Sequence, residues 1–163
     1  EYDAAVYCGK KSLEEGTADY HLKYHLLNSM YSLGQHEDSL ELCSDILNEI
    51  KEGENNDMMS NKISILALKI LNLMELGKHD EARNLVGSLK EISFEDLSEN
   101  TIANHYYNIA CVHSQMNEKS DALKYLKKSI ELDSDHNYVQ LAQTDEDLDP
   151  IRDMDEFASL VEK

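Results

Sequence analysis

The chain has 163 residues, of which 33 are Asp or Glu and 15 are Lys or Arg, so its formal net charge is −18 with the histidines neutral. Such a surface repels nucleic acid and anionic lipid, because phosphate binding depends on Lys and Arg; neutral or basic partners stay open, as does a role in solubility alone. One proline and six glycines argue against a disordered or turn-rich chain, and no run of about 18 apolar residues is present that could span a membrane. Composition therefore favours one helical domain.

The first predicted element is a helix within residues 1–16, whose buried stripe is expected to be Ala5, Cys8 and Ser12. It corresponds to the second helix of a truncated unit, of the kind that is repeated along the rest of the chain. The chain has no initial Met and no signal-peptide pattern. We therefore expect it to be part of a longer protein.

Three helix pairs are predicted next. Polar connectors at 51–57 and 93–100 separate them, and each contains an Asn or Ser that can cap the following helix. The first helix of each pair ends on a residue type that accepts a left-handed conformation. These helices span residues 18–34, 60–77 and 101–117 and end on Gly34, Gly77 and Asn117.

The second helices share one pattern. A small residue follows an acidic residue in each copy, and apolar or small residues recur about one and two turns later, which predicts one buried stripe. The stripes are Ser39/Cys43/Ile46, Ala82/Val86/Leu89 and Ala122/Leu126/Ser129. Counted from Ala5, the small residues are 34, 43 and 40 residues apart, a periodicity typical of helical repeats.

Residues 106–135 resemble a tetratricopeptide repeat. Tyr106 stands at the family's Trp position, Ile109 and Ala110 at its Leu-Gly, Ala122 at its Ala and Leu126 at its large aromatic residue. The closing IELDSD is similar to the family's ending, with Ser134 in place of Pro.

The other two units match mainly in the turn and the second helix. Unit two has Lys69 and Ile70 where the family prefers Leu-Gly, so its first helix is expected to be rotated or shifted. The resemblance implies an all-α, right-handed superhelix of antiparallel helix pairs. Residues 1–16 would be the truncated repeat and 17–135 the three complete repeats.

Residues 136–163 resemble the closing segment of bacterial tetratricopeptide arrays and are expected to form capping helices. Solenoid ends expose apolar surface that needs a cover. Asp149 is expected to cap a helix that starts at Pro150. The apolar residues expected to provide the cover are Val139, Leu141, Leu148, Ile151, Phe157 and Leu160.

The resemblance also implies a function, a protein-interaction module without catalysis that binds a peptide or partner surface in its concave groove. The sequence has no G-x-x-x-x-G-K-[ST], G-x-G-x-x-G or G-x-S-x-G motif. The groove is expected to be aromatic and amide-rich with an acidic rim, and its partner neutral to basic. Its expected residues are Tyr24, His25, Asn28, Tyr31, Leu68, Leu71, Tyr107, Asn108 and Cys111.

Two other functions are compatible with an array of this kind. The array could be the regulatory or sensor part of a larger enzyme or transcription regulator. It could also bind an acidic chaperone tail, as a subset of the family does with Lys, Arg and Asn. Of the matching positions only Asn28 and Asn108 carry an expected residue, and no base replaces the missing ones, so an acidic tail is disfavoured.

Cofactors and metals are not expected. His21 and His25 have a metal-compatible spacing but no third ligand, so they are interpreted as groove surface. His36 and His79 recur in LGQHEDSL and LGKHDEAR and are expected to pack at the turns. The acidic run 144–149 lacks the Gly and Glu of a calcium loop and is interpreted as a solvated, helix-capping turn.

The three cysteines are far apart and form no C-x-x-C pair. Their odd number and helical spacing predict free thiols that pack as small apolar side chains, in a reducing, cytoplasmic environment. Cys111 and His113 are too close in sequence to share a helical face, which disfavours a nucleophilic pair. The cysteines are Cys8, Cys43 and Cys111.

Overall fold

The computed structural model describes residues 2–50, 56–95, 97–133 and 137–162, and its regular elements are all helical in these ranges. The helices are α1 (Tyr2–Glu14), α2 (Tyr20–Ser32), α3 (His36–Glu49), α4 (Asn56–Glu75), α5 (His79–Lys90), α6 (Glu99–Gln115) and α7 (Lys119–Leu132). The tail forms α8 (Asn137–Ala142), the 3-10 helix η1 (Glu146–Leu148), α9 (Asp149–Arg152) and α10 (Asp155–Val161). The prediction of an all-α fold is confirmed.

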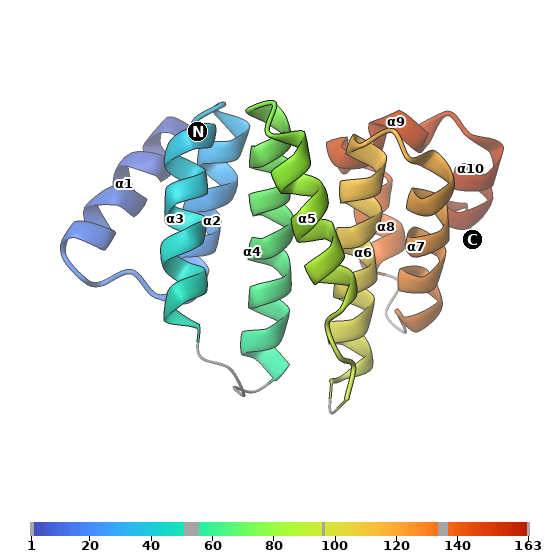
Figure 1. Ribbon diagram of the computed structural model, residues 1–163, viewed down its shortest axis with the longest axis horizontal. Coiled ribbons are helices and arrows are strands. Elements are labelled where there is room, and N and C mark those ends of the chain that lie inside the picture. Colours follow the sequence, from blue (N-terminus) through green and yellow to red (C-terminus); the bar gives the residue numbers. More distant parts are fainter. Residues whose placement is uncertain (1, 51–55, 96, 134–136, 163) are drawn as a thin grey trace.

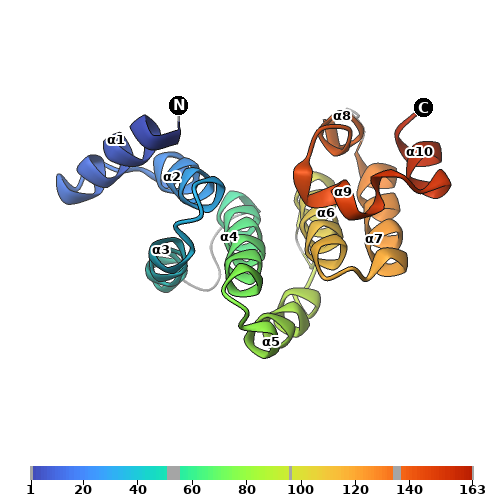
Figure 2. The same cartoon turned by 90° about the horizontal axis from the view of Figure 1, so that it is seen from above.

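The helices stand side by side in a row (Figure 1), and the view from above shows that this row curves into an arch (Figure 2). Seen from above, α2, α4 and α6 line the concave side, whereas α3, α5 and α7 lie outside them (Figure 2). The tail turns back at α8, which lies on the concave side next to α6. First helices therefore form the inner wall, as the resemblance implies, and any side chain on their inward face points into the arch.

The same helix-ending turn occurs four times among the residues that the structure describes. Gly16, Gly34, Gly77 and Asn117 have φ values of 68°, 70°, 71° and 58°. In each turn the next residue's N–H reaches back to a carbonyl five positions earlier, as from Gln35 to Met30 at 2.9 Å and from Glu118 to His113 at 2.9 Å. The left-handed ends predicted at the three first helices are confirmed.

Helix starts were predicted less completely. The Ser98 hydroxyl accepts the Thr101 N–H at 3.2 Å, which confirms a Ser cap in the second connector. Asp19, not singled out from the sequence, caps α2 by accepting the Leu22 N–H at 2.8 Å. Most of the first connector lies outside the described residues.

The buried stripes of α3, α5 and α7 are confirmed. Ser39, Ala82 and Ala122 are each fully buried, and so are the residues one and two turns further on, apart from a slight exposure of Val86. Small residues let neighbouring helices approach closely. The Ser129 hydroxyl, for example, donates to the Ala103 carbonyl of α6 at 2.8 Å.

The stripe predicted for α1 is wrong by one position. Ala5 and Cys8 are exposed, whereas Val6 and Gly9 are buried. The contact with α2 decides this register, because Gly9 lies directly against Leu26. A Cβ built on Gly9 would be only 3.0 Å from Leu26 Cδ1.

The tail packs on α6 and α7 and extends their core. Of the residues expected to cover this end, Val139, Leu148, Ile151 and Phe157 are buried and Leu160 is half-buried. Leu141 is 46% exposed and does not belong to this core. Asp149 does not cap a helix as predicted. It lies in the first turn of α9, where its carboxylate accepts the Arg152 Nε–H at 2.8 Å.

Candidate binding groove

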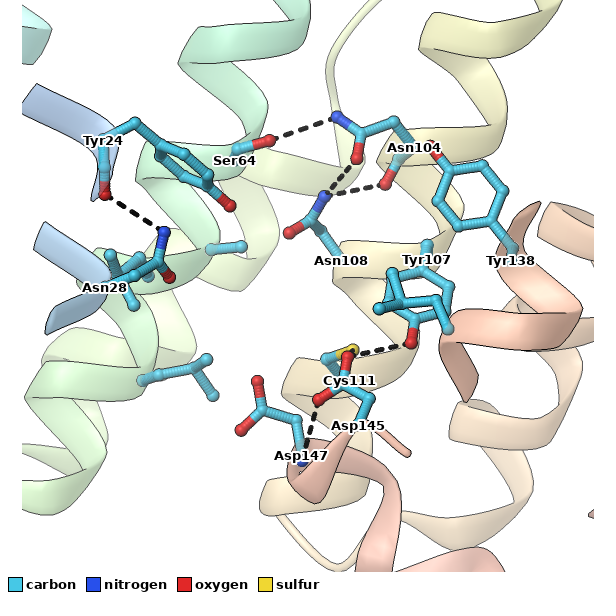
Figure 3. A pocket seen from close by; sticks show the side chains of 14 residues that line it. Tyr24, Asn28, Ser64, Asn104, Tyr107, Asn108, Cys111, Tyr138, Asp145 and Asp147 are labelled. Atoms are coloured by element: carbon cyan, nitrogen blue, oxygen red, sulfur yellow. Dashed lines mark hydrogen bonds between the residues drawn. The ribbon is translucent and has the colours of Figure 1, made fainter. Parts of the chain in front are cut away.

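A pocket of about 260 Å³ opens on the concave side, between α2, α4, α6 and the tail (Figure 3). Each inner helix contributes residues spaced three or four apart, which is the spacing of one helical face. The lining is Tyr24 and Asn28 from α2, Ser64, Ala67, Leu68 and Leu71 from α4, Asn104, Tyr107, Asn108 and Cys111 from α6, and Tyr138, Leu141, Asp145 and Asp147 from the tail.

Seven of the nine residues expected in the groove line this pocket, and the other two do not. His25 is exposed and its ring is 6.4 Å from that of Tyr24. Tyr31 is half-buried and meets His36 edge-on, with the ring centroids 5.4 Å apart. The face of α2 that lines the pocket therefore includes Tyr24 and Asn28, and it does not include His25 or Tyr31.

One end of the pocket is acidic, and the tail provides the acids. Asp145 Oδ2 accepts the Tyr107 hydroxyl at 2.8 Å and the Cys111 thiol at 3.8 Å, while its Oδ1 caps η1 by accepting the Asp147 N–H at 3.0 Å. The loop is further held by Gln115, which donates to the Asp147 carbonyl at 2.9 Å. These contacts fix both carboxylates beside α6.

The interpretation of the acidic run as a solvated turn is therefore wrong in part. Asp145 does cap a helix, but Asp145 and Asp147 are half-buried and line the pocket. The cause is tertiary, because η1 packs on α6 through Leu148, which is fully buried. The sequence signal that could have indicated this is the alternation of acids with Leu148 in a segment already expected to pack on the last repeat.

Burial and like charge act together on the ionisable groups here. Burial, reinforced by the neighbouring carboxylates of Asp145 and Glu146, raises the pKa of Asp147 to about 7. Burial raises the pKa of the Tyr107 hydroxyl and that of the Cys111 thiol well above their usual values. The thiol is thus inert at neutral pH, and the fold disfavours the charged form of Asp147.

The opposite end of the pocket carries amides and hydroxyls. Asn104 donates to Ser60 Oγ at 3.0 Å and to Ser64 Oγ at 3.1 Å, which ties α6 to α4. Asn108 donates to the side-chain oxygen of Asn104 at 2.9 Å, and Asn28 donates to the Tyr24 carbonyl at 3.1 Å. These bonds orient the amides of Asn28 and Asn108 and use only the N–H groups of these two side chains.

A second hollow of about 510 Å³ continues from this end and shares Tyr24, Ser64, Asn104 and Tyr138 with the first. It is mainly lined by hydroxyl and amide side chains, including those of Ser98 and Thr101. The two hollows together are called the groove below. Two hollows that share lining residues and together contact α2, α4, α6 and the tail suit an extended segment better than a compact small molecule.

Two groups of possible metal ligands occur among the described residues, and neither contains His21 or His25, which are both exposed. One group is Cys111, Asp145 and Asp147, whose ligand atoms lie within 4.8 Å of one another at the acidic end of the groove. The other is His113, Glu118 and Asp121, at the turn that joins α6 to α7. In the second group His113 Nδ1 is paired with Glu118 Oε2 at 2.6 Å.

The remaining cysteine and histidine predictions have mixed outcomes. Cys43 is buried, and burial raises its pKa to about 12, whereas Cys8 is exposed and does not pack as predicted. His36 packs at its turn, where Nδ1 is 3.0 Å from Asn72 Oδ1. Its counterpart His79 is exposed, so the prediction of packing is wrong there.

Comparison with known families identifies the repeat. Residues 103–136 match the family model of the tetratricopeptide repeat. The match covers most of α6 and all of α7. The chain therefore contains a tetratricopeptide repeat within an all-helical fold, and the expectation of a tetratricopeptide-repeat protein is confirmed. No curated protein and no solved structure matches the chain significantly.

Such repeats are generally non-enzymatic and suggest protein partners. In the described part of the chain, no helix has the length and apolar character needed to cross a membrane.

Proposed function

We propose that the chain is a non-catalytic interaction module that binds an extended protein segment in the groove. The observation that carries this proposal is the convergence of α2, α4, α6 and the tail on one hollow, which seven of the nine residues expected from the sequence line. The tail is proposed to close the array as well as to complete the groove wall.

Two amides support recognition of a backbone. Among the described residues, no donor reaches the side-chain oxygen of Asn28 or of Asn108, although the amide nitrogen of each is engaged. Both side chains are half-buried, so an unused acceptor there is a site for an incoming N–H. An extended segment offers such groups at regular intervals.

A random library of displayed twelve-residue peptides tests the proposal. The immobilised chain is expected to enrich related peptides, and a synthetic copy is expected to bind it in solution. In Asn28→Arg the long charged side chain would fill the pocket, so binding is expected to fall about tenfold or more. Asn84→Arg is the matched control, because Asn84 is exposed on the outer helix α5.

The control should bind the peptide as the wild type does. Equal loss in both variants, at equal helical content by circular dichroism, would contradict binding in the groove. So would a failure to enrich any related peptides.

A further inference from the structure

The pocket of about 260 Å³, called the inner pocket below, has an acidic end. Among the described residues, the fourteen that line it include Asp145 and Asp147 and no Lys, Arg or His. In the described part of the chain, the carboxylate of Asp147 has no hydrogen bond and no ion pair. A half-buried carboxylate without a partner is energetically unfavourable, and a bound cation would remove that penalty.

The two acids differ in availability. Asp145 is already held by the Tyr107 hydroxyl, the Cys111 thiol and the Asp147 N–H. Asp147 shares only its backbone in these contacts, and its carboxylate points into the space between α4 and α6 (Figure 3). Asp145 is thus a fixed structural charge, and Asp147 is the free one.

The walls between the two ends suit an aliphatic chain. Leu68 and Leu71 of α4 line the pocket together with Tyr107 of α6 and Tyr24 of α2. A long basic side chain has an apolar stem and a charged tip, so it fits a lining that is apolar along its length and acidic at its end. Aromatic rings add attraction for a nearby cation.

We infer that the inner pocket binds a lysine or arginine side chain of a protein partner, with the Asp147 carboxylate as its main counter-ion. This inference rests on the proposed function and adds the chemistry of the ligand. The amides of Asn28 and Asn108 hold the backbone of the segment, and its basic residue extends toward η1. The preference is opposite to that of an array that grips an acidic tail.

Charge complementarity is the main argument for this occupant. The chain carries a net charge of −18, so a basic segment is attracted over distance as well as at the site. The ligand atoms of Cys111, Asp145 and Asp147 lie within 4.8 Å of one another, so one cationic tip can reach both acids.

The peptides selected on the wild-type chain provide the test. With EDTA present and the peptide N-termini acetylated, the enriched set is expected to have Lys or Arg at one fixed position. Replacing that residue by norleucine should weaken binding about 10- to 100-fold, since one partner of a buried charge pair is removed. Asp147→Asn should cause a similar loss with the original peptide and little further loss with the norleucine peptide.

Asp153→Asn is the matched control, because Asp153 is an exposed carboxylate of the tail that does not line the pocket. It should leave the affinity within about twofold. Enriched peptides without a fixed basic position, or peptides that bind Asp147→Asn as tightly as the wild type, would overturn the inference while leaving binding in the groove intact.

Two other cations are also outcomes of the test. Binding that requires a free peptide N-terminus would mean that an α-amine occupies the pocket. Tight binding of Zn²⁺ alone, lost in Asp147→Asn, would mean a metal site. Either result would overturn the inference.

Discussion

Asp147 is the residue at which the requirements of folding and binding differ most. Its pKa of about 7 in the folded chain is above the ordinary value of 3.8, so the folded state disfavours the charged form. A raised carboxyl pKa makes the folded state bind more protons than the unfolded state, so stability falls as the pH rises from about 4 through 7. The groups that contribute or respond to this shift are Asp145, Glu146 and Asp149 in the tail, Glu75 in α4, Tyr31 in α2 and Tyr107 and Cys111 in α6.

Asp147→Asn should therefore stabilise the free chain. Asparagine keeps the shape and removes the charge, so the gain is expected to be about 1–3 kcal/mol at pH 8 and to shrink as the pH approaches 4. Urea unfolding of both proteins at pH 8 and pH 4.5 measures it. An equal difference at the two pH values would show that the charge is not the cause.

Two glycines of similar helical placement should respond oppositely to alanine. A Cβ on Gly87, in α5, meets nothing within 4 Å, so Gly87→Ala should raise stability by about 0.5–1 kcal/mol through helix propensity. A Cβ on Gly9 would be 3.0–3.2 Å from three Leu26 atoms, so Gly9→Ala should instead lower stability by about 1 kcal/mol. Thermal melts of the two variants measure the difference, and a gain for both would show that the α1–α2 contact is loose.

The burial of a single residue can be predicted from the sequence when its own helix determines it, and less well when a contact with another element does. The stripe of α3 was predicted correctly because Ser39, Cys43 and Ile46 form one clear helical face. In α1 two faces one residue apart were plausible, and the contact of Gly9 with Leu26 on another helix selects between them. Asp147 was misinterpreted for the same reason, since its burial depends on where η1 packs.

At the scale of elements, the helix ends are the most predictable feature. A Gly or Asn at the end of an amphipathic pattern indicates a left-handed residue from local sterics alone. Gly34, Gly77 and Asn117 all have positive φ values. The course of the tail was less predictable, because short helices such as α8 and α9 depend on what they contact. Leu141 was expected to cover the core and lines the groove instead.

The turn after α4 gives a backbone test without packing effects. Gly77 has φ 71° and a Cβ there would meet nothing within 4 Å. Gly77→Ala should therefore lower stability by about 1–2 kcal/mol through left-handed strain alone. Asn117, with φ 58°, occupies the same place after α6, so Asn117→Gly should be neutral or slightly stabilising. Denaturant unfolding measures both, and a neutral Gly77→Ala would mean that the turn relaxes to another conformation.

At the scale of the whole molecule, the arch separates two tasks. Outer helices α3, α5 and α7 carry the regular stripes that hold neighbours together, and they are where the sequence was most predictive. Inner helices present alternating buried and groove-facing residues, so their functional face is less distinct in the sequence. On α2, for example, Tyr24 and Tyr31 are seven residues apart and were expected on the same face. Of these two, only Tyr24 lines the groove.

Salt should separate the effect of the overall charge from that of the acidic pocket. The excess of 33 acids over 15 bases makes the free chain repel itself, so raising NaCl from about 20 mM to about 500 mM should raise its melting temperature through screening. The same change should weaken the binding of a basic peptide, because it screens the attraction on which the complex depends.

Asp147→Asn should show the same rise in melting temperature with salt, since only one charge of many is removed. Its affinity for the peptide should depend less on salt. Melting curves and fluorescence anisotropy on one salt series measure both. A melting temperature and an affinity that rise together with salt would mean that apolar contacts, and not charge, dominate the groove.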